Sequence, residues 1–308
     1  MSITSACRQL GYSKQAFFKS RRNKQLKVCF EEMVKHKVLK IRAQLPRIGV
    51  RKLYYMIKTD LIRSNIPMGR DRLFSLLRQE NLLIKTKKKY TKTTYSKHWM
   101  HKYPDLVKHL KARRPEQVWV ADITYLNLGK EFGYLHLVTD AYSKKVMGYK
   151  VSADLSATHT IDALKQALRT RSYKGPLTHH SDRGLQYCSA GYVQLLIKNG
   201  IQISMTQDGS PYDNAIAERI NGILKDEFGL DDTFKNLQEA EVQTKQAIKL
   251  YNQMRPHLSC SMLTPMKMHR QSKLEVKAWH KKSTRTMEGP CGFLPSLPIN
   301  KPVNLFQD

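Results

Sequence analysis

Three carboxylates stand at positions from which they could support metal-dependent chemistry. Asp122 lies in QVWVADITYLNL, Asp182 in HHSDRGLQY and Glu218 in SPYDNAIAERINGILK. Carboxylate oxygens together with water are the ligands that Mg²⁺ and Mn²⁺ prefer. Two such ions ~3.5–4 Å apart can activate an attacking oxygen and stabilise a leaving oxygen in an in-line phosphodiester displacement. These three residues are therefore the candidate catalytic and metal-binding residues, with two ions as the expected cofactor.

A lysine follows the last carboxylate at helical spacing. Lys225 comes seven positions after Glu218, which is nearly two turns at ~3.6 residues per turn, so both would share a polar face with Asn214. The apolar residues of the same segment mostly lie elsewhere on the helix and could pack inward: Ile216, Ile220, Ile223 and Leu224. Lys225 could then hold a DNA phosphate. The alternative is a solvated helix lysine.

The elements that must position these residues alternate between strands and helices from residue 117 onward. Runs of β-branched and aromatic residues predict five strands, of which the first three form an antiparallel meander: 117–128, 134–143, 145–152, 177–182 and 201–206. Apolar periodicity predicts three helices, at 158–170, 189–200 and 212–229. The order βββαβαβα is that of ribonuclease-H-like folds. We therefore predict an α/β core over 117–270, with a mixed five-stranded sheet and helices.

This order of elements lets the three carboxylates converge. Asp122 lies in the first strand, Asp182 follows the neighbouring fourth strand, and Glu218 lies on a helix that crosses them. Four other carboxylates compete with them: Asp140, Asp154, Asp162 and Asp213. Asp140 is the strongest competitor, because it follows the second strand, but a structural or supporting role is favoured for it.

Two further groups of polar residues allow a functional or a structural interpretation. His179 and His180 could orient a water molecule or contact DNA, or they could be strand-end histidines held by hydrogen bonds. A polar motif after the last predicted helix could touch DNA, although packing is favoured: Tyr251, Asn252, Arg255, Pro256 and His257.

The charge of the chain requires a polyanionic partner. The 308 residues hold 54 Lys and Arg against 25 Asp and Glu, a net charge of +29. Nucleic acid and an anionic membrane surface are the two obvious partners. No apolar run reaches the ~18 residues of a membrane helix, and the N-terminus has no signal-peptide core. The five cysteines are scattered and form no CxxC pair, which indicates reduced thiols in a cytosolic protein.

Most of the positive charge precedes residue 117. Residues 1–116 hold 30 Lys and Arg against 7 Asp and Glu, whereas residues 117–270 hold 18 against 15. We predict helix-turn-helix units at 1–40 and 41–84, a basic linker at 85–116 and a partly disordered tail at 271–308. Ser13 suits the N-cap of a helix whose Phe17 and Phe18 pack inward. The candidate DNA contacts are Lys14, Arg21, Arg22, Arg70, Arg72, Lys87, Lys88 and Lys89. The alternatives are simple helical hairpins and a solvated linker.

Four segments carry a resemblance to a known family. They are WVADITYL (119–126), HSDRGLQY (180–187), YDNAIAERINGILKDE (212–227) and YNQMRPHLSCSMLTP (251–265). With these four segments in this order, the chain resembles the DDE transposases of insertion sequences, of the OrfB type in the IS-three family, which have a retroviral-integrase-like core. The resemblance spans about residues 5 to 270. It implies an acidic triad at Asp122, Asp182 and Glu218, and a basic residue at Lys225.

The resemblance also implies an activity and its partners. Such proteins bind the terminal inverted repeats of their element, cut one strand to expose a 3′-OH, and use that hydroxyl to attack target DNA, with Mg²⁺ or Mn²⁺ as cofactor. A homo-oligomer on DNA, a helix-turn-helix partner from an upstream reading frame, and the nucleoid of the bacterial cytoplasm are the implied setting. Two alternatives remain open: a catalytically inactive DNA-binding regulator of transposition, and a simple ribonuclease-H-like nuclease.

Overall fold

A computed structural model of the chain describes residues 2–84, 99–108, 110–207 and 215–274. Several residues singled out from the sequence lie outside these ranges: Lys87, Lys88, Lys89, Asp213, Asn214 and most of the tail. No helix in the described ranges has the length and apolar character needed to cross a membrane.

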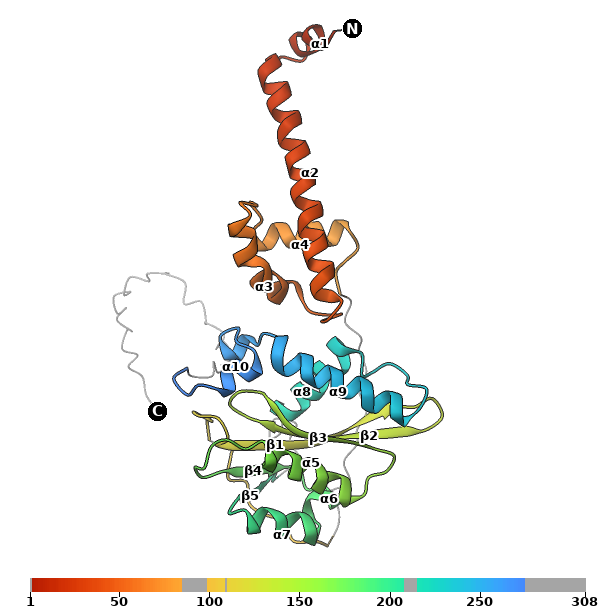
Figure 1. The fold of residues 1–308 in the computed structure, drawn as a ribbon, viewed down its shortest axis with the longest axis vertical. Coiled ribbons are helices and arrows are strands. Elements are labelled where there is room, and N and C mark those ends of the chain that lie inside the picture. Colours follow the sequence, from red (N-terminus) through yellow and green to blue (C-terminus); the bar gives the residue numbers. More distant parts are fainter. Residues whose placement is uncertain (1, 85–98, 109, 208–214, 275–308) are drawn as a thin grey trace, which may run out of the picture. The chain divides into compact units, whose positions relative to one another are not determined.

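A mixed five-stranded sheet forms the centre of the C-terminal part (Figure 1). Its strands lie in the order β3-β2-β1-β4-β5, with β1 antiparallel to β2 and parallel to β4. Their bounds are β1 Val118–Asn127, β2 Phe132–Asp140, β3 Val146–Ser152, β4 Thr178–Ser181 and β5 Gln202–Met205. The sheet confirms the predicted meander and the predicted pairing of the first and fourth strands.

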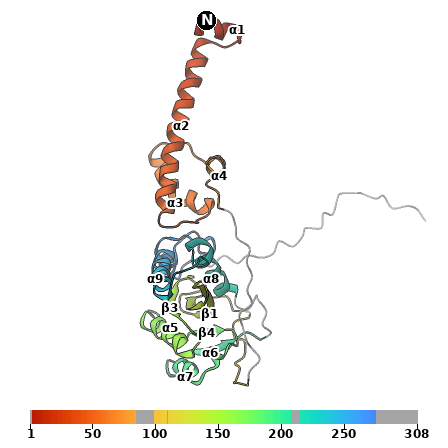
Figure 2. The same ribbon diagram turned by 90° about the vertical axis from the view of Figure 1, so that its right-hand side faces the viewer.

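Helices cover both faces of the sheet, as both views of the molecule show (Figures 1 and 2). One face carries α5 (Ala157–Arg169), α6 (Leu185–Cys188) and α7 (Ala190–Lys198); the other carries α8 (Ala215–Phe228) and α9 (Leu237–Met254). Alternate residues of β1 serve the two layers. Trp119 and Ala121 pack toward α5–α7, and Val118 and Val120 pack with Ala217 of α8. The four-residue helix α6 is absent from our prediction, because so short a segment has no detectable period.

Glycine allows β3 and α5 to pack closely. A Cβ atom at Gly148 would lie 2.1 Å from the carbonyl oxygen of Ala163 and 2.6 Å from the nitrogen of Ala167. Both of these are backbone atoms, which a rotamer change cannot move. The absence of a side chain at residue 148 therefore sets the distance between this helix and the sheet.

The N-terminal part is helical, but its boundaries differ from the prediction. Its helices are α1 Ile3–Gln9, α2 Lys14–Arg42, α3 Val50–Arg63 and α4 Arg70–Gln79. The boundary predicted between residues 40 and 41 falls inside α2, because no Gly or Pro interrupts this segment before Pro46. Val34 and Val38 of α2 share one hydrophobic core with α3 and α4. The second half of α2 therefore belongs to the unit predicted to begin at residue 41.

The first half of α2 buries little. Phe17 and Phe18 remain 40% and 43% exposed, so the expectation that they pack inward is wrong. Ser13 does cap the helix, as predicted, by accepting a hydrogen bond from the backbone of Ala16 at 3.1 Å.

Candidate active site

The site begins on β1, at Asp122. Its partly buried side chain lies on the sheet face that α8 covers, where Nδ2 of Asn221 donates to Asp122 Oδ2 at 2.7 Å. Asn221 is itself buried, with 6% of its surface exposed. Sequence reasoning did not select this asparagine. Its spacing three residues after Glu218 could have revealed it, because residues i and i+3 share a helix face.

Asp182 joins Asp122 because β4 runs parallel to β1. Val118 and Val120 pair with Thr178 and His180, so the chain leaves β4 beside the middle of β1. The backbone N–H of Gly184 donates to Asp182 Oδ1 at 3.0 Å. Asp122 and Asp182 line one cavity of about 520 Å³. The other lining residues are Met100, Ile123, Tyr125, Leu155, Ala157, Gly184, Leu185, Gln186, Tyr187 and Ser189.

Glu218 stands apart from the two aspartates. It lies in the first turn of α8, one turn before Asn221, and its side chain is exposed and does not line the cavity. Among the described residues, no three His, Cys, Asp or Glu side chains gather closely enough to hold a metal ion. The structure therefore brings two of the three predicted carboxylates together and places the third on the adjacent helix.

Burial and neighbouring negative charge perturb the pKa of Asp122. Burial and then the charge of Asp182 raise its pKa from 3.8 to about 7, with a smaller contribution from Glu218, whereas the hydrogen bond from Asn221 opposes the rise. A divalent cation would relieve the repulsion between these carboxylates. The oxygen donors of Asp122 and Asp182 thus fit Mg²⁺ or Mn²⁺.

Lys225 lies two turns beyond Glu218 and is partly buried. Burial lowers its pKa, while the charges of Asp231, Asp122 and Asp226 act in the opposite direction. The contribution from Asp122 indicates that the ammonium group lies within electrostatic range of the acidic site.

The two histidines that could have contacted water or DNA have hydrogen-bond partners in the core. His179 Nε2 and the Tyr192 hydroxyl are hydrogen-bonded at 2.8 Å, and His180 Nδ1 and Ser204 Oγ at 2.9 Å. Burial lowers the pKa of His179 to about 3, which keeps it neutral. The interpretation of both histidines as structural therefore fits the geometry better than a role in binding water or DNA.

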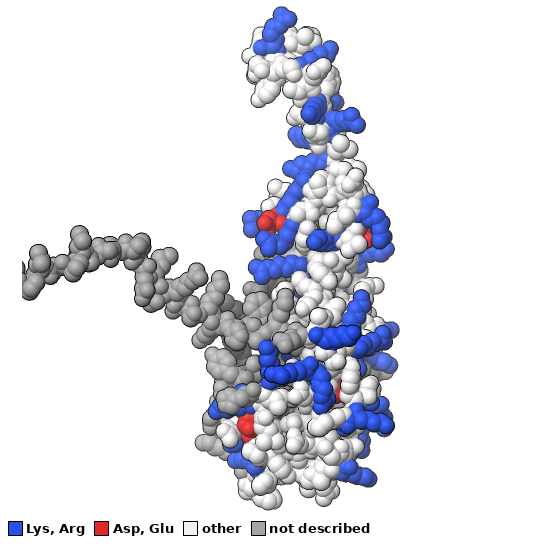
Figure 3. All heavy atoms as spheres, turned by 90° about the vertical axis from the view of Figure 1, so that its left-hand side faces the viewer, with Lys and Arg blue, Asp and Glu red and all other residues white. Residues whose placement is uncertain are grey.

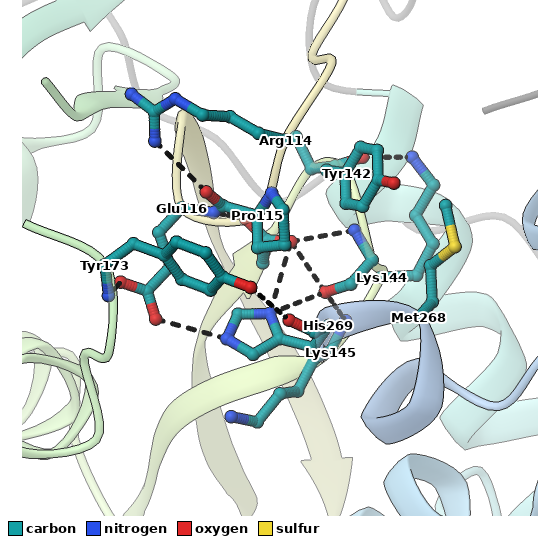
Figure 4. A network of polar contacts seen from close by, with 12 residues as sticks. Arg114, Pro115, Glu116, Tyr142, Lys144, Lys145, Tyr173, Met268 and His269 are labelled. Atoms are coloured by element: carbon teal, nitrogen blue, oxygen red, sulfur yellow. Dashed lines mark hydrogen bonds and ion pairs between the residues drawn. The ribbon is translucent and has the colours of Figure 1, made fainter. Parts of the chain in front are cut away.

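Asp140 belongs to a buried network beside the start of β1, where it pairs with Trp119. Figure 4 shows Glu116 and His269 of this network. The Asp140 carboxylate accepts hydrogen bonds from the backbone of Glu116 at 2.7 Å and from the Ser143 hydroxyl at 2.6 Å. His269, on α10 (Pro265–His269), lies 3.1 Å from Glu116 and 3.6 Å from Asp140. Hydrogen bonds to these two carboxylates outweigh burial and raise the pKa of His269. Asp140 is thus structural, as predicted.

The polar motif of residues 251–257, at the end of α9, also packs, as predicted. The Asn252 side chain bonds both the N–H and the carbonyl oxygen of Val146 at 3.0 Å. Buried Arg255 donates to both carboxylate oxygens of Glu227, at 2.6 and 2.7 Å. Lys52 of α3 contacts the same carboxylate at 2.9 Å, which ties the helical part to the end of α8.

The N-terminal cations differ in their surroundings. Lys14, Arg21 and Arg22 are exposed along α2, whereas Arg70 pairs with Asp71 at 2.8 Å and Arg72 with Glu31 at 3.5 Å. Lys and Arg side chains are spread over the helical part and over the core on the face drawn in Figure 3, where few acidic side chains are visible. This surface suits a polyanion.

The fold and the acidic site define a class, the integrase-core nucleic-acid enzymes. Comparison with known proteins identifies the family within this class. The integrase core domain family matches residues 112–211, and a second integrase core domain family matches residues 199–265. An uncharacterised 31 kDa protein of insertion element IS600 from Shigella sonnei is 34% identical, over 74% of this chain and 85% of that protein. Transposase InsF for insertion sequence IS3A from Escherichia coli is 32% identical, over 67% of this chain and 73% of that protein.

Among solved structures, the catalytic core domain of HTLV-2 integrase in complex with magnesium is 24% identical. The matched region covers 51% of this chain and 97% of the integrase chain, with a TM-score of 0.42. On the similarity to the insertion-sequence proteins, the chain belongs to the IS-three family of transposases with an integrase core. It is a transposase and a polynucleotidyl transferase.

Proposed function

We propose that Asp122, Asp182 and Glu218 hold two Mg²⁺ or Mn²⁺ ions and that this site cuts and joins DNA at the ends of the element. The observation that carries the proposal is the shared cavity of Asp122 and Asp182, together with the mutual repulsion of their charges. Glu218 would complete the set by a change in its own rotamer or in the first turn of α8, to which it belongs.

The chemistry proposed for this site consists of two displacements at phosphorus. In the first, a water oxygen attacks the phosphodiester at the element end, and the bond to the 3′ oxygen breaks to leave a 3′-OH. In the second, that hydroxyl attacks a target phosphodiester, and the target 3′ oxygen leaves. When bound, the divalent ions would supply activation of the attacking oxygen and charge stabilisation of the leaving oxygen.

The protein's own residues would position the participants. Asn221 holds Asp122 in place through its 2.7 Å hydrogen bond. Lys225 would bind a phosphate beside the carboxylates. The exposed cations of α2, Lys14, Arg21 and Arg22, would bind the terminal inverted repeats, with smaller roles for Arg70 and Arg72 because both are engaged by carboxylates.

The assembly around this site is part of the same proposal. We infer a homo-oligomer on DNA, aided by a helix-turn-helix protein from an upstream frame, working at the nucleoid of the bacterial cytoplasm. Exposed Phe17 and Phe18 on α2 are consistent with a helical surface that has a further partner.

The test is strand cleavage and joining on a cognate inverted-repeat end in Mg²⁺. Asp122→Asn and Glu218→Gln should each lower both rates by roughly 100-fold or more, because each removes a charge that stabilises the transition state through the ions. Asp162→Asn is the matched control, since this carboxylate lies exposed on α5 beside Lys165. Unchanged rates in the first two variants would contradict the triad, and a wild type without activity would favour the regulator.

A further inference from the structure

Tyr187 has its ring in the core and lines the cavity of the acidic site. It lies on α6, five residues after Asp182, and lines the cavity that contains Asp122 and Asp182. Only 2% of its surface is exposed. Its ring meets Tyr192 edge to face, with centroids 5.5 Å apart, and lies 6.4 Å from the ring of His179. This packing fixes the direction in which the hydroxyl points.

The Tyr187 hydroxyl is buried without a hydrogen-bond partner among the described residues. Two other buried tyrosines of the core are satisfied: the Tyr192 hydroxyl is bonded to His179, and the Tyr251 hydroxyl donates to the carbonyl oxygen of Lys144 at 2.7 Å. A buried polar group without a partner destabilises the fold, and phenylalanine would fill the same space without that cost. The missing partner is therefore expected to arrive with a ligand.

The surroundings of this hydroxyl identify the kind of partner. A tyrosine hydroxyl with its ordinary pKa of about 10 is protonated near neutral pH, so the group is a hydrogen-bond donor. It needs an acceptor that enters the cavity beside two carboxylates. Of the molecules that a transposase brings there, DNA offers such acceptors in the oxygens of its phosphates.

We propose that the Tyr187 hydroxyl donates a hydrogen bond to a non-bridging oxygen of the reacting DNA phosphate. The inference rests on the proposed function of Asp122 and Asp182 and adds a residue to it. Tyr187 would then position the phosphate between the carboxylates and favour its charged transition state. The hydroxyl remains protonated throughout, because its task is to donate a hydrogen bond.

Tyr187→Phe tests the proposal with a minimal change in shape. In the full-length chain, strand joining in Mg²⁺ should fall about 10- to 100-fold, as expected for a hydrogen bond to a charged group. The melting temperature should stay equal or rise, because the variant removes an unsatisfied buried hydroxyl. Joining at the wild-type rate would overturn the proposal, as would a loss of activity accompanied by an equal loss of folded protein.

Tyr192→Phe is the matched control. It removes the hydroxyl from the neighbouring buried ring and leaves His179 without its 2.8 Å partner. Its melting temperature should fall, while the joining rate below the melting transition stays within about two-fold of wild type. If both variants lost the same activity, Tyr187 would be acting through the packing of the core, and the proposal would fail.

Phosphorothioate DNA locates the contact. The scissile phosphate carries sulfur at one non-bridging position, which gives two diastereomers. The joining rate of each diastereomer is measured for wild type and for Tyr187→Phe in Mn²⁺, which accepts sulfur ligands better than Mg²⁺. For one diastereomer the two proteins should differ by less than three-fold, because sulfur has already weakened the acceptor. An equal defect with both diastereomers would overturn the contact. Asp122→Asn on the same DNA tests the proposed function separately from the Tyr187 contact. If this variant still joined DNA at the wild-type rate, the proposed function itself would be contradicted.

Discussion

At the scale of single residues, the cost of burying a carboxylate beside a second carboxylate governs the site. Asp122 is held by one amide from α8 and stands against Asp182 in a shared cavity. Its pKa of about 7 shows that the fold tolerates this carboxylate more easily when it is protonated. Function and stability are therefore opposed at this residue, as at many active sites.

This opposition predicts a dependence of stability on pH. The pKa of Asp122 in the folded protein lies above its ordinary value of 3.8, so its contribution to stability is complete below that value and is lost as pH rises through about 7. In a chelator at pH 8, Asp122→Asn should raise the free energy of unfolding by on the order of a few kcal/mol. Chemical denaturation at pH 5 and pH 8 would measure the difference.

Mg²⁺ supplies the control for that measurement. Added Mg²⁺ should stabilise wild type at pH 8, because a ligand that binds only the folded state shifts the unfolding equilibrium, and it should stabilise Asp122→Asn much less. The idea is wrong if Asp122→Asn is no more stable than wild type at pH 8 or if Asp162→Asn gives the same gain.

At the scale of elements, the parallel pair β1 and β4 and the helix α8 assemble the site. The pairing of β1 with β4 sets the positions of Asp122 and Asp182, and α8 lies on the sheet through Ile220, Ile223 and Leu224. On the opposite face, the spacing between β3 and α5 depends on Gly148. The site therefore needs both helical layers to be packed against the same sheet.

Gly148→Ala should disrupt that packing. The new methyl group would overlap the backbone of α5, so we expect a loss of roughly 1–3 kcal/mol or more in unfolding free energy, measured by urea denaturation. Gly222→Ala in α8 is the matched control, because no atom lies within 4 Å of its built Cβ. This control should gain about 0.5–1 kcal/mol from its helix propensity. A neutral Gly148→Ala would show that the two elements can separate easily.

At the scale of the whole molecule, the positive charge is concentrated in the residues before 117. The 30 Lys and Arg before residue 117 belong largely to helices and linker, and the core is nearly balanced. Three of these cations, Lys14, Arg21 and Arg22, are exposed on α2. Arg70 and Arg72 have carboxylate neighbours, so they are expected to release fewer counterions on binding DNA.

Replacement of the three α2 cations by alanine should change the salt dependence of DNA binding. The slope of log affinity against log salt should become shallower by roughly 2–3, because each phosphate contact contributes about 0.9. Fluorescence anisotropy on an inverted-repeat end would measure it. Lys165, Arg169 and Lys198, exposed on α5 and α7, provide a triple-alanine control of equal charge. Equal slopes for the two triple variants would show that these three cations of α2 do not contact the DNA phosphates.

The amino-acid sequence by itself predicted the order of the five strands and of the helices α5, α7 and α8, because alternation and periodicity are local properties. It did not predict α6, α9 or α10. The sequence also singled out Asp122, Asp182, Glu218 and Lys225, since residue type and spacing along the chain are visible without a fold. The strand boundaries agree with the structure to within about two residues, apart from short extensions into turns.

Only the tertiary structure decided what surrounds these residues. Asn221 holds Asp122, and Asp140 serves a buried network. Tyr187 lines the cavity of the two aspartates, and its hydroxyl has no partner among the described residues. The continuity of α2 across residues 40 and 41 also emerged only there. The physical reason is that burial and hydrogen bonding depend on contacts between residues distant in sequence, whereas periodicity reports only which face a residue occupies.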